Sequence, residues 1–470
     1  MSDGLETVTA AVKAFTPEAV ATPTGVPATL TRELARDLAS APAAVCYGRV
    51  GVSTQEFGGL CCWLINVVNA VTGNLDRPGG AMFTRPAADL LALADRAGQR
   101  GHFDKGRSRV RGLPEFGGEW PVAVLAEEIE TAGSGKIRAL VTSAGNPVLS
   151  TPNGARLGRA LESLDFMVSI DIYLNETTRH AHLILPPTFA LEHSHYDLVF
   201  HALAVRDTAK YSPALFPAGP DQRHDWEILL ELATRLRAAR GDGALGARLR
   251  RAFFRALHPD RIVAWLLRTG PHGSGLLPFR AGLTLGRLRG SPHGIDLGPL
   301  APRLPGRLYT RNHRIDLAPA RLVADVERAR NALSAAAGDG ALRLIGRRDL
   351  RSNNSWMHNS PRLVQGRDRC TLLMHPRDAA ARALAAGQKV RIRSRAGSVV
   401  AALELTEDMM PGVVSLPHGW GHGREGTRLR VAKERPGASL NDLTDEQLVD
   451  PLSGNARFSG VPVEVTPAPA

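Results

Sequence analysis

The stretch from residue 137 to residue 192 constrains the fold of this 470-residue chain more than any other. Two short apolar runs, 137–141 and 166–170, flank a helical pattern at 154–164, and a third run follows at 183–185. Strand, helix and strand at this spacing predict a βαβ crossover, with parallel strands in a buried sheet. In such sheets, the loops beyond the carboxyl ends of the strands line the ligand crevice.

The loops after these predicted strands carry residues that suit a nucleotide. The first loop contains Gly145 and Asn146, the second begins with Asp171, and the third holds two prolines at 186–187. A glycine lets backbone amides approach a ligand closely. An aspartate can accept two hydrogen bonds from the amino/imino edge of guanine, or hold a ribose hydroxyl. An ordinary α/β turn with a capping aspartate explains the same residues, so both interpretations stay open.

The sequence words around these loops resemble the guanine-nucleotide domain of molybdopterin oxidoreductases. They are Ala-Gly-Asn-Pro at 144–147, Asp-Ile-Tyr-Leu-Asn-Glu-Thr at 171–177 and His-Leu-Ile-Leu-Pro at 182–186. This family includes bacterial nitrate reductases, formate dehydrogenases and dimethyl sulfoxide reductase, and it holds two pterin guanine dinucleotides around one molybdenum or tungsten. The resemblance implies that Asp171 meets one guanine. It also implies that Gly145 and Asn146 lie along that dinucleotide, and that Glu192 is close to it.

An earlier stretch, residues 45–80, resembles the same family. It is predicted as a short buried strand at 43–47, a glycine turn, a buried helix at 57–71, and then Thr-Gly-Asn and Arg-Pro-Gly-Gly. Two glycines around Arg49 could seat an anion, and a surface turn is the competing interpretation. The resemblance implies that four residues approach a pterin dinucleotide: Gly48, Arg49, Thr54 and Gln55.

From residue 341 the pattern changes to short strands. Residues 389–393 and 399–405 alternate about a turn at 396–397, which predicts a β-hairpin with one buried side and a small β-barrel. The words here resemble the family's carboxy-terminal cap, a double-psi-like barrel that closes over both dinucleotides. The resemblance implies cofactor contacts from Arg347, Asn354, Ser355, His358, Asn359 and Asn441. Amides and hydroxyls suit pterin edges, and an arginine fork suits phosphate.

Composition excludes several other classes of protein. The net charge of +12 would suit nucleic acid, but the arginines are dispersed and only 5% of residues are aromatic, so we expect no nucleic-acid partner. The four cysteines form no CxxC pair and are predicted to be buried free thiols. The most apolar run, 60–71, is too short to span a bilayer, and the amino terminus lacks a signal-peptide pattern. We therefore expect a cytoplasmic protein.

The predicted α/β architecture has three parts. Residues 1–80 form the tail of an α/β domain. Residues 81–340 form the guanine-nucleotide domain with a variable, Arg-rich insertion at about 215–340, and residues 341–470 form the barrel. The resemblance does not extend to the family's upstream half, which carries the metal-ligating residue and often an iron–sulfur cluster. We therefore expect a truncated chain or a split subunit, with the upstream half or an electron-transfer subunit as partner. A [4Fe–4S] cluster is expected only in that upstream part.

The function implied by the resemblance is that of a molybdopterin oxidoreductase, similar to nitrate reductase or formate dehydrogenase. It would bind bis(molybdopterin guanine dinucleotide) with molybdenum or tungsten, for oxygen-atom or electron transfer to a small-molecule substrate. No residue matches a catalytic base or a metal ligand of the family, so neither is assigned. The alternative is a cofactor-free structural subunit of an electron-transfer complex that retains the fold. A nicotinamide-dependent dehydrogenase ranks below both, because no GxGxxG follows a first strand.

Overall fold

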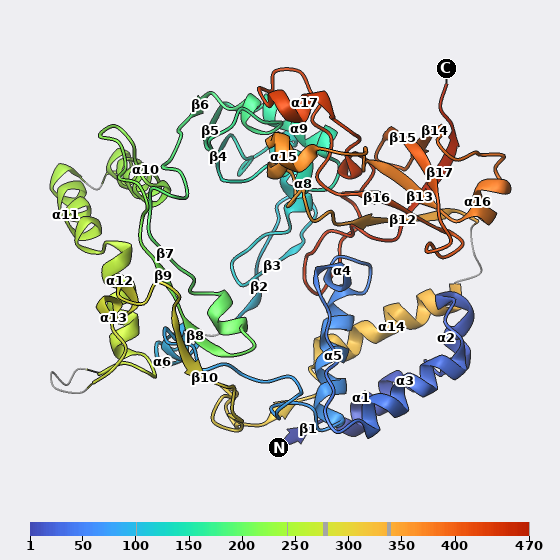
Figure 1. Ribbon diagram of the computed structural model, residues 1–470, viewed down its shortest axis with the longest axis horizontal. Coiled ribbons are helices and arrows are strands. Elements are labelled where there is room, and N and C mark those ends of the chain that lie inside the picture. The colour runs from blue at the N-terminus through green and yellow to red at the C-terminus, as the bar shows by residue number, and fades with distance from the viewer. Residues whose placement is uncertain (100, 242, 276–280, 336–339, 470) are drawn as a thin grey trace.

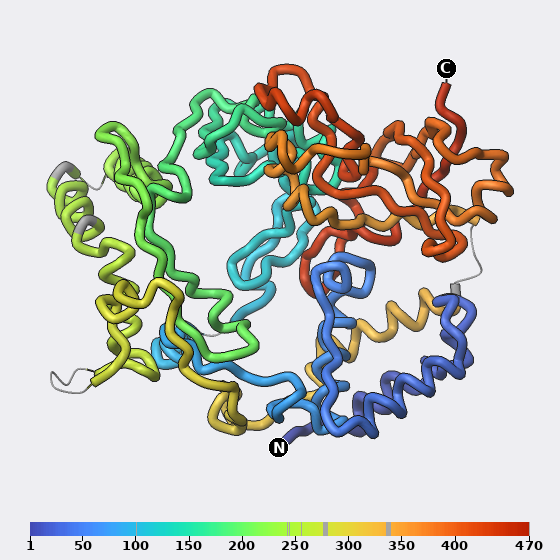
Figure 2. The backbone as a smooth tube through the Cα atoms, viewed as in Figure 1, coloured from blue at the N-terminus to red at the C-terminus, as the bar shows by residue number. Residues whose placement is uncertain are grey.

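A computed structural model of the chain describes residues 1–99, 101–241, 243–275, 281–335 and 340–469. Three assemblies are prominent: a group of amino-terminal helices, a small parallel sheet with its helices, and a closed barrel (Figure 1). The backbone follows a ring-like course, and the barrel adjoins both the sheet and the amino-terminal helices (Figure 2). None of the described helices is both long and apolar enough to cross a bilayer.

The parallel sheet confirms the predicted βαβ crossover. Its strands, in the order β4-β5-β6, are β4 (Ala139–Ser143), β5 (Phe166–Ile170) and β6 (Leu183–Ile184). Helices α8 (Pro147–Ser150) and α9 (Gly154–Glu162) connect the first strand to the second. The side chain of Asn153 accepts a hydrogen bond from the Arg156 backbone and so begins α9.

Helices α7 (Leu125–Glu130) and α9 cover one face of this sheet. Met167 packs with Leu157 and Leu161 of α9, in a core that also includes residues of α7. Alternation along the strands sends three apolar side chains to the opposite face, where about half of each is exposed: Val141 (47%), Phe166 (49%) and Leu183 (47%). Val168 and Ile170 on the same face are buried, so this face is exposed only in part, whereas parallel sheets are usually covered on both faces.

The carboxy-terminal region forms the predicted closed barrel, with strands in the order β12-β16-β13-β15-β14-β17. The strands are β12 (Leu342–Arg347), β13 (Thr371–Met374), β14 (Lys389–Arg393), β15 (Ser398–Leu405), β16 (Val413–Pro417) and β17 (Val461–Pro467). The predicted hairpin is the antiparallel pair β14–β15, whereas β12–β16 and β13–β15 pair in parallel. Alternating residues such as Leu344, Leu372 and Val390 are fully buried in its core.

The amino-terminal helices are α1 (Leu5–Val12), α2 (Pro17–Thr24), α3 (Ala28–Ser40), α4 (Val50–Ser53) and α5 (Gly58–Val71). Of these, α1 and α5 pack against a helix from much later in the chain. Val8 and Trp63 share a core with Val326 of α14 (Ala320–Ala335), and Trp63 Nε1 donates to the carbonyl of Leu317 at 2.9 Å. Thr16 caps the start of α2, because its hydroxyl accepts from the Ala19 backbone.

Three predictions for the cysteine-bearing segments were wrong. Residues 43–47 form no strand, because the side chain of Asn69 takes the place of a neighbouring strand and bonds both the N–H and the C=O of Cys46, each at 2.8 Å. Helix α5 is buried on one face only, since Val71 is half-exposed. Cys62 is exposed rather than buried, because it lies on the outer side of α5.

The middle of the chain contains further regular elements. Residues 82–121 include α6 (Leu90–Arg96) and a hairpin of β2 (Phe103–Arg107) and β3 (Pro114–Phe116). The Arg-rich insertion contains helices α10 (Asp225–Ala239), α11 (Gly243–Ala256), α12 (Pro259–Thr269) and α13 (Leu285–Arg289). Short strands β8 (Asp207–Ala209) and β10 (Ile295–Gly298) pair beside α13 and connect this insertion to the rest.

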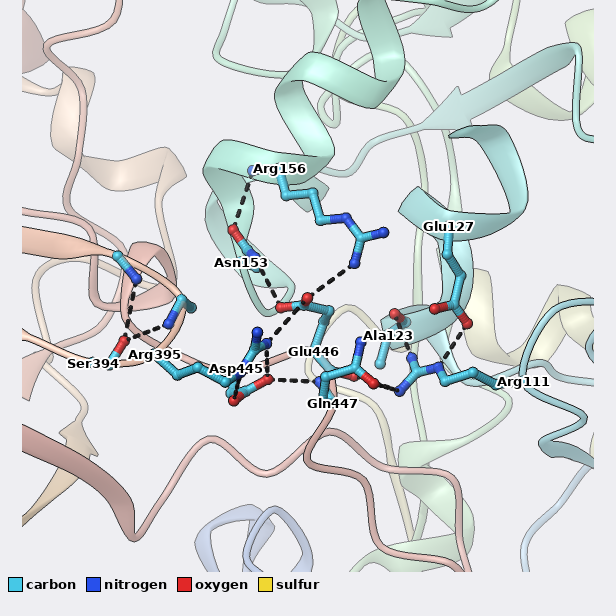
Figure 3. Close-up of polar contacts among 12 residues, drawn as sticks. Arg111, Ala123, Glu127, Asn153, Arg156, Ser394, Arg395, Asp445, Glu446 and Gln447 are labelled. Atoms are coloured by element: carbon cyan, nitrogen blue, oxygen red, sulfur yellow. Dashed lines mark hydrogen bonds and ion pairs between the residues drawn. The ribbon is translucent and has the colours of Figure 1, made fainter. Parts of the chain in front are cut away.

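A network of charged and polar side chains holds the barrel to the sheet (Figure 3). Glu446 accepts hydrogen bonds from Asn153 at 2.8 Å and from Arg156 at 2.9 Å, both at the start of α9. Arg395, in the turn between β14 and β15, binds Asp445 with both arms of its guanidinium and also contacts Glu446 at 3.2 Å. These bonds orient the two lobes that carry the candidate site.

Candidate functional site

The loop after β4 is held by hydrogen bonds from its asparagine. Asn146 Nδ2 donates to Glu176 Oε2 at 2.8 Å, and Asn146 Oδ1 accepts from the Thr177 hydroxyl at 2.7 Å. Ala144 adopts a left-handed conformation with φ 51°, which turns the chain sharply before Gly145. A Cβ placed on Gly145 would have no neighbour nearer than 3.7 Å, so the backbone here is open to a ligand.

Asp171 lies at the end of β5, as predicted. Its two carboxylate oxygens accept from the Tyr173 backbone at 3.0 Å and from Asn175 Nδ2 at 3.1 Å. Burial raises the pKa of the Asp171 carboxyl above its usual value, against the opposing effect of these hydrogen bonds. A ligand that donates further hydrogen bonds would stabilise the ionised form, and the amino/imino edge of guanine is such a ligand.

A chain of three buried side chains connects the sheet lobe to the barrel lobe. Glu176 Oε1 lies 3.0 Å from His422 Nδ1, and His422 Nε2 lies 3.0 Å from His358 Nδ1. Glu176 and His422 are fully buried, and His358 is 4% exposed. Burial would raise the pKa of Glu176, but the contact with His422 outweighs it, so this pKa lies below its usual value. Burial lowers the pKa of His358 to about 3.

The far end of this chain faces a small, Arg-rich cavity. His358 Nε2 is buried and has no hydrogen-bond partner. The cavity has a free volume of about 20 Å³, about one water molecule. Around it lie Trp420, Asp349, Ser352, Arg351, Arg367, Arg369 and Arg435. The His358 and Trp420 rings are 4.4 Å apart, so the histidine is held rigidly beside a site that favours anions.

The loop at 352–359 packs closely against the segment after β16. Gly419 has φ 98°, and a Cβ there would come within 1.8 Å of the Asn354 carbonyl oxygen, so only glycine fits. The Asn354 side chain is exposed, and Ser355 is half-buried. Both side chains therefore have exposed surface, as a cofactor contact requires. They lie on the same loop as Ser352 and His358, which line the Arg-rich cavity.

Three other predicted barrel residues already have partners within the chain. The Arg347 guanidinium donates to the carbonyls of Ser415 at 2.6 Å and Thr371 at 2.8 Å. Asn359 Oδ1 accepts from the backbone at the start of α17 (Arg430–Glu434). Asn441 is fully buried and donates to the Leu149 carbonyl at 2.6 Å. These bonds stabilise the barrel and its attachment to α8.

The predicted residues at 48–55 lie at a different junction. The carbonyl of Thr54 accepts from the backbones of Phe458 and Ser459, which places this segment against the carboxy-terminal region. Gln55 bonds locally, to Cys61 Sγ at 3.1 Å and to the Phe57 backbone at 2.9 Å. Arg49 is exposed, and Gly48 is half-buried against α5.

Glu192 lies apart from this junction. It accepts from the Phe189 backbone at 2.6 Å and faces Gln222 at 3.3 Å. The structure therefore brings together Asn146 and His358, through Glu176 and His422. The sequence had assigned no role to Glu176 and His422. Among the described residues, no group of three or more His, Cys, Asp or Glu side chains is placed to hold a metal ion.

The geometry defines a class of protein with an α/β lobe and a β-barrel lobe that meet at buried polar residues. Comparison of the sequence with family models identifies two matches, the molybdopterin oxidoreductase model over residues 24–235 and the molydopterin dinucleotide binding domain over residues 342–462. The chain belongs to the molybdopterin oxidoreductase family. These models imply the family's cofactor, molybdenum or tungsten held by molybdopterin guanine dinucleotide.

Curated relatives agree with this family. Formate dehydrogenase H of Escherichia coli is 28% identical over 250 residues, 50% of this chain and 34% of that protein. The NADPH-Fe(3+) oxidoreductase subunit alpha of Geobacter sulfurreducens is 25% identical over 364 residues, 75% of this chain and 36% of that protein. The assimilatory nitrate reductase catalytic subunit of Bacillus subtilis is 32% identical over 111 residues, 23% of this chain and 15% of that protein. The chain thus spans about a third of these relatives, or less.

A solved structure shares the fold. Acetylene hydratase from Pelobacter acetylenicus superimposes with a TM-score of 0.68 at 15% sequence identity, covering 99% of this chain and 66% of that protein. The predicted architecture, a parallel α/β lobe followed by a closed barrel, is confirmed.

The residues of the site fit a molybdopterin guanine dinucleotide. The unpartnered His358 Nε2 is an unused hydrogen-bonding atom, which a pterin or guanine edge could pair. The nearby arginines suit a pyrophosphate. Asp171 suits a guanine edge, because its half-buried carboxylate gains from further donors.

Proposed function

We propose that this chain is the dinucleotide-binding portion of a molybdenum or tungsten oxidoreductase. The observation that carries the proposal is the junction where Asn146 of the sheet lobe connects through Glu176 and His422 to His358 of the barrel lobe. A single ligand with a purine and phosphates could contact both lobes there. When bound, the metal and its pterins supply the oxygen-atom or electron transfer chemistry.

The chain's own residues would bind and orient that group. Asp171 would accept hydrogen bonds from one guanine, and the open backbone at Gly145 would lie along its phosphates. Asn354, Ser355 and the arginines around the cavity would hold a dinucleotide from the barrel side. Gly48 and Arg49 would contribute from the amino-terminal segment. No residue is assigned as an acid, a base or a metal ligand.

A partner polypeptide is part of this proposal. The partly exposed face of the sheet, on which Val141, Phe166 and Leu183 are about half-exposed, supports the docking of a further layer of structure. The partner would be an upstream half of the enzyme or an electron-transfer subunit, and it would supply the metal ligand. By similarity to the relatives, the substrate is a small molecule of the kind reduced or oxidised by formate dehydrogenases and nitrate reductases.

The test is the cofactor content of the purified full chain, produced in a host that makes molybdopterin guanine dinucleotide. Elemental analysis would report molybdenum and tungsten, and denaturation followed by chromatography would report guanine nucleotide. The proposal predicts guanine nucleotide and pterin in fixed proportion to the chain. Their absence, in a chain that is folded and saturated with its partner, would contradict it.

A cofactor-free structural subunit is the second candidate. It is favoured by the internal hydrogen bonds of Arg347, Asn359 and Asn441, because these bonds occupy donors or acceptors that a ligand would otherwise contact. The same experiment separates the two functions, because a structural subunit would form the complex without guanine nucleotide or pterin.

A further inference from the structure

The chain Glu176–His422–His358 can exist in two hydrogen-bonding directions, and one of them is favoured by the structure. An ionised carboxylate only accepts hydrogen bonds, so His422 Nδ1 must carry the proton that lies between it and Glu176. In a neutral His422 ring, Nε2 then accepts. His358 Nδ1 must therefore donate to it, which leaves His358 Nε2 with a free lone pair.

The alternative is an imidazolium at His422, which would donate from both ring nitrogens and reverse the bond to His358. Glu176 and His422 are both fully buried, and a neutral ring leaves one ionised group here, whose two oxygens accept from His422 Nδ1 and Asn146 Nδ2. The titratable and charged groups that face His358 from neighbouring elements are Asp349, Arg369, His422 and Glu176. Asp349 and Arg369 lie 3.3 Å apart as an ion pair, so their charges largely offset one another at the ring.

We propose that Glu176 and His422 are positioning residues that fix the tautomer of His358, so that His358 Nε2 accepts a hydrogen bond from an N–H group of the bound pterin or guanine. The identity of this ligand rests on the proposed function. The cavity has room for about one atom of a ligand besides hydrogen, so a single donor group reaches the ring while the bulk of the cofactor stays outside. His358 Nε2, which has no partner among the described residues, is then the atom that accepts the ligand's hydrogen bond.

The three hydrogen-bonded residues come from both lobes, so binding of the cofactor at His358 depends on both. Glu176 comes from the loop after β5, whereas His422 and His358 come from the barrel region. Asn146 Nδ2 donates to the other oxygen of Glu176, which fixes the carboxylate's orientation. A ligand donor on His358 is therefore recognised only when the two lobes are docked.

The variant Glu176→Gln tests this mechanism, because it reverses the direction of the hydrogen bonds along Glu176–His422–His358 while the side chain keeps its shape. The glutamine oxygen would keep the bond from Asn146 Nδ2, and its amide nitrogen would then donate to His422 Nδ1. Each histidine would respond by moving its proton from Nδ1 to Nε2 and remain neutral. His358 Nε2 would become a donor and would repel a ligand N–H group.

The first measurement is the tautomer of His358 in the cofactor-free full chain, by long-range ¹H–¹⁵N correlation with ¹⁵N-labelled histidine. His358→Gln assigns the signal. We expect a proton on Nδ1 in the wild-type chain and on Nε2 in Glu176→Gln. A wild-type ring protonated on Nε2, or an unchanged tautomer in a folded Glu176→Gln chain, would overturn the proposal. The wild-type result decides it even if the variant does not fold.

The second measurement is guanine nucleotide retained per chain. The matched control is Glu115→Gln, since Glu115 is also buried and also lies 3.0 Å from a histidine Nδ1, that of His102, in a different part of the fold. We expect Glu176→Gln to lose nucleotide and Glu115→Gln to keep it. Equal retention by both variants would overturn the positioning role. A wild-type chain with the expected tautomer but no nucleotide would instead refute the proposed function.

Discussion

Glu446 Oε1 lies 2.9 Å from Arg156 Nη1, so a carboxylate from the segment before the last strand binds a guanidinium on α9. Glu446 is 4% exposed and also accepts from Asn153. This contact holds the barrel and the sheet in the arrangement on which the candidate site depends.

Loss of the Glu446 charge is expected to destabilise the docked lobes in acid. Burial would raise its pKa, but the hydrogen bonds from Asn153, Arg156 and Arg395 outweigh burial and lower the pKa of Glu446 to about 2. A carboxyl with a lowered pKa in the folded state stabilises the fold above its unfolded pKa. That contribution is lost as the pH falls from about 4.5 towards about 2.

The variant Glu446→Gln is predicted to lower the free energy of unfolding at neutral pH by roughly 3 kcal/mol, since it removes this contribution. Denaturant unfolding across the acid range is the measurement. The difference between wild type and variant should shrink as the pH falls. A difference that stays constant down to the lowest pH would show that the carboxylate's charge has no part in docking.

The bonds of Asn69 are predicted to anchor residues 43–47. Asn69→Ala would leave the N–H and the C=O of Cys46 without partners, at a cost of about 2 kcal/mol. Hydrogen exchange at Cys46 and limited proteolysis of this segment are the measurements. The control is Asn66→Ala, one turn earlier on α5, whose exposed side chain bonds only the Cys62 carbonyl. Equal protection in the two variants would contradict the anchoring role.

Thiol labelling should distinguish the cysteines. Cys62 is exposed, so we expect it to react first with a thiol reagent such as DTNB. Burial raises the pKa of the Cys370 thiol to about 11, so Cys370 should react only after unfolding. Cys62→Ser should remove the fast phase. A fast phase that survives this substitution would place another thiol at the surface.

Arg347 is predicted to stabilise the barrel through the hydrogen bonds that its guanidinium donates to backbone carbonyls. Arg347→Lys would lose at least one of the bonds to the Ser415 and Thr371 carbonyls and lower the free energy of unfolding by roughly 2 kcal/mol. The control is Arg391→Lys on β14, where the side chain is exposed. Thermal unfolding of both variants is the measurement. Equal stability would indicate that Arg347 is held for a ligand rather than for the barrel.

The sequence was sufficient for elements whose pattern is local. The βαβ crossover and the β14–β15 hairpin follow from short apolar runs and turns, and the structure contains both. The predicted strand at 43–47 failed because its composition suits a strand, yet its partner is a side chain, Asn69, that no periodicity reveals.

The site could be predicted only in part, because its connections cross large sequence distances. Asn146 and His358 were predicted as separate contacts, but Glu176 and His422 were not. Glu176 and His422 are 246 positions apart, and each stands in a motif with no separate signal of pairing. The internal partners of Arg347 and Asn441 were equally hidden, since a sequence shows which groups can bond but not which are already bonded.

The central claim is that the two lobes bind a molybdopterin guanine dinucleotide, with Asp171 at a guanine. The most direct measurement is the guanine nucleotide released per chain from wild type, Asp171→Asn and the control Asp165→Asn, whose exposed carboxylate only pairs with Arg138. The account predicts that wild type and the control release the same amount and that Asp171→Asn releases about tenfold less. Equal release from all three folded chains would contradict it.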